Sequence, residues 1–194
     1  MARFVALLRG VNVGGNNRVP MADLRRLFIS EGHRSVATYL QSGNVVFTAN
    51  GAVDAQALES AIARRLGIET TVVLRSPDDL KRVVAANPFP AADLSHLHVG
   101  FMAYAPPPNA TAGLDAASFQ PEQFALVGLE IYLHLPNGMG RAKLPPLLDR
   151  KLKVPTTVRN WNTVNKLIEL AATGGWSCAY DGIRVRRNRG GLRA

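Results

Sequence analysis

The sequence contains one cysteine, Cys178, among 194 residues, so no disulfide can form within the chain. Scarce cysteine fits a reducing compartment. No apolar run approaches the ~18 residues that a membrane-spanning helix requires, and the apolar stretch near the N-terminus is too short for a secretory signal. We therefore expect a cytoplasmic protein without a membrane partner.

Residues that bind metals or transfer protons are also few. The four histidines show no metal-ligand spacing with the cysteine, and His96 and His98, which share one face of a predicted strand, lack a third ligand. No nucleophile-elbow motif appears. The sequence therefore predicts no metal and no cofactor, and it identifies no catalytic residue.

Acidic residues are sparse in the last part of the chain. Residues 1–140 carry eleven basic and eleven acidic residues, whereas residues 141–194 carry twelve basic and three acidic ones and so account for the net charge of +9. Five arginines lie in the final segment RVRRNRGGLRA. Residues 176–194 are predicted to form a disordered basic tail, which either binds nucleic acid or is a solvated terminus.

The hydrophobic pattern of residues 1–75 predicts a ferredoxin-like half. Its elements follow in the order strand, helix, strand, strand, helix, strand, which is typical of that arrangement. The expected strands are 4–11, 36–40, 45–48 and 70–74, and the expected helices are 20–31 and 54–66.

Residues 76–175 repeat this order more loosely after an initial helix. Ser76 and Pro77 are typical of a helix start. The elements expected next are strand 98–105, helix 110–117, hairpin 123–127 and 130–135, helix 144–152, strand 156–159 and helix 163–172. The predicted fold class is α+β, with two ferredoxin-like (βαββαβ) halves, antiparallel sheets and extra helices.

Four polar loops pair off in this topology. The loop after the first strand, GVNVGGNN (10–17), shares a sheet edge with the turn QSGN (41–44), and NGMGRAK (137–143) shares one with RNWN (159–162). The first loop has neither P-loop nor dinucleotide-binding spacing. Glycine backbone, amides and cations still suit an anion.

These loops, together with Arg9 just before the first of them, supply the candidate ligand-binding residues. They contain no Asp or Glu, which argues against acid–base catalysis. Trp161 is either a stacking platform for a base or a core anchor. The candidates are Arg9, Asn12, Gly14, Gly15, Asn16, Gln41, Ser42, Asn44, Arg141, Lys143, Arg159, Asn160 and Asn162.

Three functions stay open at this point. The first is a binding domain for a small anionic ligand, such as a nucleotide, or for a nucleic acid. The second is an enzyme that acts on a phosphorylated or carboxylated substrate without protein carboxylates. The third is a structural or interaction module in which the loops pack the two halves together. The sequence does not indicate an oligomeric state.

Three stretches, LLRGVNVGGNNRVPMADLR, TYLQSGNVVF and TTVRNWNTVNKL, together resemble the DUF1697 family of bacterial proteins. The resemblance extends over roughly residues 3–172. It implies two ferredoxin-like halves and no particular activity. The family's second-half loop has a glycine turn followed by Ser-Lys-Leu, whereas Ala142 stands at the serine position here, so a role for that hydroxyl is not expected.

Overall fold

The computed structural model describes residues 1–15, 17–114 and 116–173. Its first half contains one four-stranded sheet and two helices, and its second half contains another four-stranded sheet and three α-helices. The first half comprises β1 (Ala2–Leu8), α1 (Met21–Ser30), β2 (Arg34–Tyr39), β3 (Asn44–Ala49), α2 (Ala55–Leu66) and β4 (Val72–Arg75). The second comprises α3 (Pro77–Ala85), β5 (Leu97–Met102), β6 (Gln123–Val127), β7 (Glu130–His134), α4 (Leu144–Leu152), β8 (Thr156–Asn160) and α5 (Trp161–Ala172), with short 3-10 helices η1 (Leu94–His96), η2 (Ala116–Phe119) and η3 (Met139–Arg141).

The two sheets have the same topology. Their strand orders are β2-β3-β1-β4 and β6-β7-β5-β8, and every neighbouring pair is antiparallel. When the strands of each half are numbered from one to four along the chain, both sheets have the order 2-3-1-4. The predicted α+β class with two ferredoxin-like halves is confirmed.

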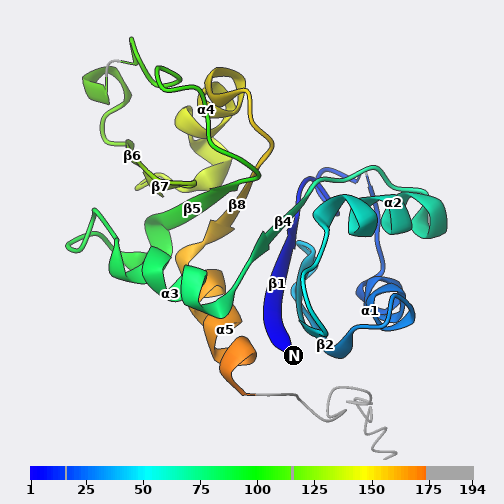
Figure 1. The fold of residues 1–194 in the computed structure, drawn as a ribbon. Helices are drawn as coiled ribbons and strands as arrows, with labels where there is room; N and C mark the ends of the chain where they lie inside the picture. The colour runs from blue at the N-terminus through cyan, green and yellow to red at the C-terminus, as the bar shows by residue number, and fades with distance from the viewer. Residues whose placement is uncertain (16, 115, 174–194) are drawn as a thin grey trace, which may run out of the picture.

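The elements stack in five layers (Figure 1). Helices α1 and α2 cover the outer face of the first sheet, and α4 covers the outer face of the second. Helices α3 and α5 lie between the sheets, in one core that includes Val5 and Val73 from the first sheet and Val99 and Phe101 from the second. The alternation of strand side chains makes this possible, because successive residues face opposite sides of a sheet.

Local sequence signals explain where several helices begin and end. Ser76 accepts a hydrogen bond from the Asp79 amide, and the Asp79 carboxylate accepts one from the Ser76 amide, a complete capping box for α3. Helix α2 ends at Gly67, whose φ of 67° is left-handed. These local features determine where α3 begins and where α2 ends.

The connection between β5 and β6 differs from the expectation. The predicted helix 110–117 is wrong: the chain forms turns there, followed by η2. The stretch APPPNATAG combines three prolines with a glycine, which removes backbone donors and disfavours helical geometry. Strand β5 also ends earlier than expected, at Met102, because its neighbours β7 and β8 begin opposite its end, at Glu130 and Thr156. The predicted disordered tail 176–194 lies outside the described residues.

Candidate functional site

Arg159 on β8 lies at the seam, the contact between β8 and the loops that follow β1 and β2. Its side chain is buried, with 6% of the residue exposed. Nε donates to Oδ1 of Asn44 at 2.5 Å, and Nη2 donates to the carbonyls of Leu8 and Ser42, both at 2.8 Å. One side chain of the second half thus holds three positions of the first.

The remaining donors of Arg159 bind its own strand. Nη1 donates to Oγ1 of Thr157 at 2.7 Å and to the carbonyl of Val158 at 2.9 Å. The guanidinium therefore makes five hydrogen bonds, as many as it has N–H groups. Burial lowers the pKa of Arg159 to about 10, so the group stays charged at neutral pH. None of its donors is left for a ligand.

Asn44 is fully buried at the same seam. Its Nδ2 donates to the carbonyl of Tyr39 at 2.8 Å and to Oγ of Ser42 at 2.9 Å, while its Oδ1 accepts from Arg159. The turn QSGN is therefore tied internally by the amide that also receives the arginine. Both Ser42 and Asn44 are used to hold the turn and the seam.

Asn12 performs a similar role in the glycine-rich loop. It adopts a left-handed φ of 55°, and its Nδ2 donates to the carbonyls of Val19 and Gln41 at 3.0 and 2.7 Å. Its Oδ1 accepts from the Val19 amide at 2.8 Å. The predicted pairing of GVNVGGNN with QSGN is thus seen directly, through Asn12. The side chain of Gln41 remains exposed.

The outer rim of the seam is exposed to solvent. Arg9 Nη2 lies 3.0 Å from an Asp149 carboxylate oxygen on α4, and the two side chains are 42% and 49% exposed. Gly14 and Gly15 are exposed, with φ values of 59° and 83°. Asn16, which the sequence also proposed, lies outside the described residues. Arg9 is one of the residues predicted to neutralise the charge of a ligand. It lies at this rim, and its side chain remains exposed.

The loop 137–143 follows β7 and shares a sheet edge with RNWN, as predicted, because β7 and β8 are both antiparallel to β5. Arg141 and Lys143 are exposed, and the Lys143 amide donates to both carboxylate oxygens of Glu122 at 2.9 and 3.0 Å. Within residues 1–15, 17–114 and 116–173, no hydrogen bond or ion pair joins this loop to the other three. The buried Glu122 anchors the start of α4, and the two cations point to solvent.

The last predicted loop, RNWN, is a strand-to-helix junction. Oδ1 of Asn160 accepts from the Asn162 amide at 2.9 Å and so caps α5, and Nδ2 of Asn160 donates to the Ser95 carbonyl at 3.0 Å. Because of this cap, α5 begins at Trp161 rather than at 163. Trp161 is 4% exposed in the core between the sheets, which makes it a core anchor and not a stacking platform. Asn162 is exposed.

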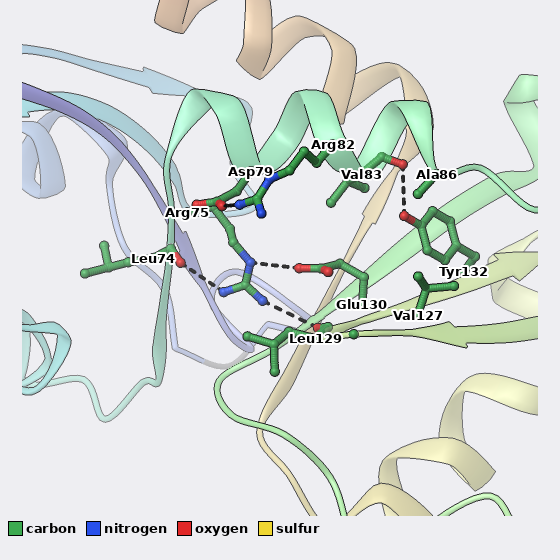
Figure 2. Close-up of a pocket in the computed structure, with 11 residues that line it drawn as sticks. Leu74, Arg75, Asp79, Arg82, Val83, Ala86, Val127, Leu129, Glu130 and Tyr132 are labelled. Atoms are coloured by element: carbon green, nitrogen blue, oxygen red, sulfur yellow. Dashed lines mark hydrogen bonds and ion pairs between the residues drawn. The ribbon is translucent and has the colours of Figure 1, made fainter.

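A groove that sequence reasoning missed lies between α3, the end of β4 and the β6–β7 hairpin (Figure 2). Its volume is about 450 Å³. Arg75 Nε lies 2.9 Å from Glu130 Oε1 at its base, and Arg82 pairs with Asp79 at its rim. These two pairs leave the groove without net charge. No sequence motif marks it, because it joins the consecutive elements β4 and α3 to a hairpin that lies far from them along the chain.

Tyr132 lies at one end of the groove and donates from its hydroxyl to the Val83 carbonyl at 2.9 Å. Burial, with a smaller effect of Glu130, raises the pKa of Tyr132 to about 12. The tyrosine of the unfolded chain ionises near pH 10, so the contribution of Tyr132 to stability is complete below about pH 10 and is lost as pH rises to about 12.

We expect Tyr132→Phe to lower the free energy of unfolding at neutral pH by about 1 kcal/mol, because the Val83 carbonyl loses its donor. Urea denaturation of both proteins between pH 7 and about pH 12 measures the difference. The advantage of the tyrosine protein should shrink above about pH 10. A difference that does not change with pH would contradict this assignment.

No group of three or more His, Cys, Asp or Glu residues suited to a metal ion occurs in the described part of the chain. Within the same residues, no helix has the length and apolar character needed to cross a membrane.

Comparisons with known proteins agree with this fold. The family model described as "Protein of unknown function (DUF1697)" matches residues 1–132. A solved structure, described as that of a conserved bacterial protein from Streptococcus pneumoniae, superposes with a TM-score of 0.64 at 25% identity and covers 88% of this chain and 98% of that one. No curated protein gives a match. The chain belongs to the DUF1697 family.

Proposed function

We propose that the chain binds the phosphate backbone of a nucleic acid at the open rim of the seam. The observation that carries this proposal is the set of exposed cations beside the glycine-rich loop. Arg9 contacts α4 through Asp149 and the start of β8 through the Thr156 carbonyl, at 3.2 Å from Nε. This contact places the loop next to the basic C-terminal end of α4.

That end of α4 is strongly basic. Arg150, Lys151 and Lys153 are exposed and lie within four residues after Asp149, with Arg150 and Lys151 in the last helical turn. Together with Arg9, which pairs with Asp149 at the same helix end, they form the rim patch of four exposed cations. Such a cluster attracts a polyanion, and the attraction is electrostatic rather than base-specific.

The scarcity of free hydrogen-bond donors among the described residues of the seam also favours a polymer over a small ligand. Arg159, Asn44, Ser42 and Asn12 use their polar atoms on protein partners, as described above, so the seam offers few convergent donors to a small anion. With Trp161 in the core, the proposed contact depends on phosphates and not on base stacking. An exposed cationic rim is the arrangement through which proteins contact a nucleic-acid backbone without reading its sequence.

Two matched variants test the proposal by fluorescence anisotropy with a labelled duplex DNA. Lys151→Gln with Lys153→Gln removes two charges from the rim patch. Arg34→Gln with Lys81→Gln removes two charges from β2 and α3, and both variants keep the arginines near the C-terminus. We expect the first variant to weaken binding and to reduce the salt slope of log K by about 2, and the second to leave both nearly unchanged.

Equal loss in the two variants would show that net charge alone governs binding and would overturn the rim patch as a site. No anisotropy change at low salt would overturn nucleic-acid binding itself. Nucleotides serve as competitors in the same assay, and displacement by a mononucleotide at low concentration would point to a small-ligand site instead.

A second candidate is favoured by one specific observation. Arg159 of RNWN donates to Asn44 and Ser42 of QSGN across the seam, and Asn12 of GVNVGGNN donates to the Gln41 carbonyl of the same turn. An interaction module whose loops pack the two halves together requires such bonds. This alternative predicts that variants of the rim patch have no binding phenotype, whereas variants of the seam lose stability. The stability measurements described in the Discussion separate the two roles.

A further inference from the structure

Strand β6 lies at an edge of the second sheet, with β7 on one side. No strand within the described residues lies on the other side. Val127 faces Glu130 across the two-residue turn that joins the strands, and in such hairpins the residues flanking the turn exchange hydrogen bonds. Alternation then directs the amide and carbonyl groups of Phe124 and Leu126 away from β7, towards the free edge.

This edge lacks the features that usually prevent pairing with another chain. The strand reads QFALV, without charge or proline, and Leu126 and Val127 are 37% and 41% exposed. The corresponding edge strand of the first sheet, β2, is different. Strand β2 begins with an exposed arginine, Arg34, and its pairing is irregular between Arg34 and Ala37, where Ser35 has a φ of 48°. Charges and bulges protect edges, and β6 has neither.

We infer that β6 pairs in antiparallel fashion with β6 of a second copy of this chain, which joins two four-stranded sheets into one of eight strands. The strand is self-complementary in the register that keeps all five residues paired. In that register Ala125 faces its own counterpart across the two-fold axis, and Phe124 faces Leu126 of the second copy. Each Phe124–Leu126 pair exchanges the hydrogen bonds that the free edge leaves open.

Charge at the β6 edge does not oppose a second copy as the occupant. The chain carries a net charge of +9, so two copies repel one another over most orientations, but the β6 edge contributes no charge to that repulsion. The cations of the neighbouring helix α3 are balanced, because Lys81 pairs with Asp78 and Arg82 pairs with Asp79. An acidic or basic peptide has no charged partner on this strand.

The groove beside β6 provides space for the same contact. Val127 and Tyr132 line it below α3. Ala125 pairs with Tyr132 in the sheet and therefore shares its face. A second β6 strand continues this face and places its own Val127 and Gln123 side chains along the groove. The partner strand therefore covers apolar surface that is exposed in one copy.

Two experiments test the pairing. Analytical ultracentrifugation of the full chain from about 1 µM to about 1 mM should show a reversible monomer–dimer equilibrium. Ala125→Lys should abolish the dimer, because it sets two lysine side chains directly opposite each other, with Cβ atoms about 5 Å apart across the axis, and like charges at such positions are destabilising. Its circular dichroism spectrum should match that of the parent chain, and so should its melting temperature at about 1 µM, where dimerisation adds least to the stability of the parent chain.

Disulfide trapping tests the register without relying on that variant. In a Cys178→Ser background, Ala125→Cys should crosslink two copies on mild oxidation, because directly opposed residues have Cβ atoms about 5 Å apart. Val127→Cys is the matched control, since two copies of position 127 lie about 13 Å apart in this register. A monomer at all concentrations, a dimer that survives Ala125→Lys, or equal crosslinking at both positions would overturn the inference.

Discussion

Replacing Arg159 with methionine should lower the free energy of unfolding more than any exposed substitution at the seam. Methionine preserves much of the side-chain length and removes all five donors. The Ser42 carbonyl and the Asn44 amide oxygen then lose their buried partner, and each such orphaned acceptor costs about 1–3 kcal/mol, which gives a loss of about 2–6 kcal/mol. Urea denaturation, followed by tryptophan fluorescence, measures the change.

Arg9→Met provides the matched control for this prediction. Both arginines reach across the same seam, but Arg9 is 42% exposed and its ion pair with Asp149 is solvated. Such pairs contribute about 0–1 kcal/mol. Arg159→Lys should fall between the two variants, because an ammonium keeps the charge but lacks the planar fork that reaches several acceptors at once. Equal losses for Arg159→Met and Arg9→Met would show that the buried network does not hold the halves together.

Gly43→Ala should have the second large effect on stability. Gly43 has a φ of 72°, and a Cβ built there would lie 2.5 Å from Val11 Cγ2 and 2.8 Å from Leu8 Cβ. The Leu8 atom is fixed to the backbone of β1 and cannot move aside. A left-handed alanine costs about 1–2 kcal/mol, and overpacking adds about 1–3 kcal/mol, so the melting temperature should fall strongly.

Gly10→Ala separates the two contributions. Gly10 has a similar φ of 68°, but a Cβ there would meet nothing within 4 Å. It should therefore show the backbone cost alone, about 1–2 kcal/mol. If Gly10→Ala and Gly43→Ala destabilise the protein equally by differential scanning calorimetry, the close approach of QSGN to the glycine-rich loop contributes nothing.

Much of the fold follows from local patterns in the sequence. The apolar strands, the Gly67 stop of α2 and the Ser76 start of α3 are encoded within a few residues, and periodicity locates them. The order of the elements then fixes which loops share an edge. The helix expected at 110–117 failed because isolated alanines in APPPNATAG favour a helix less than the neighbouring prolines and glycine oppose it.

The role of the candidate site depended on contacts that local patterns do not contain. Sequence reasoning singled out Arg159 and Asn44 but proposed both as ligand-binding residues and placed them at different sheet edges, because it could not place β8 against the first half. One signal was available: Thr157 and Arg159 lie two residues apart on a strand and therefore share a face, which in β8 is buried. The groove beside α3 had no comparable signal.

The position of α5 between the sheets has a consequence for the growing chain. The inner face of the first sheet packs against this helix, which ends at Ala172, and the Leu8 carbonyl binds an arginine 151 residues later. During synthesis, the strands made first must therefore wait for the helix made last before that face is covered. Such distant pairing carries a large loop-closure cost before it contributes stability. The two halves share a topology, but the first half cannot finish folding on the ribosome before the second half is made.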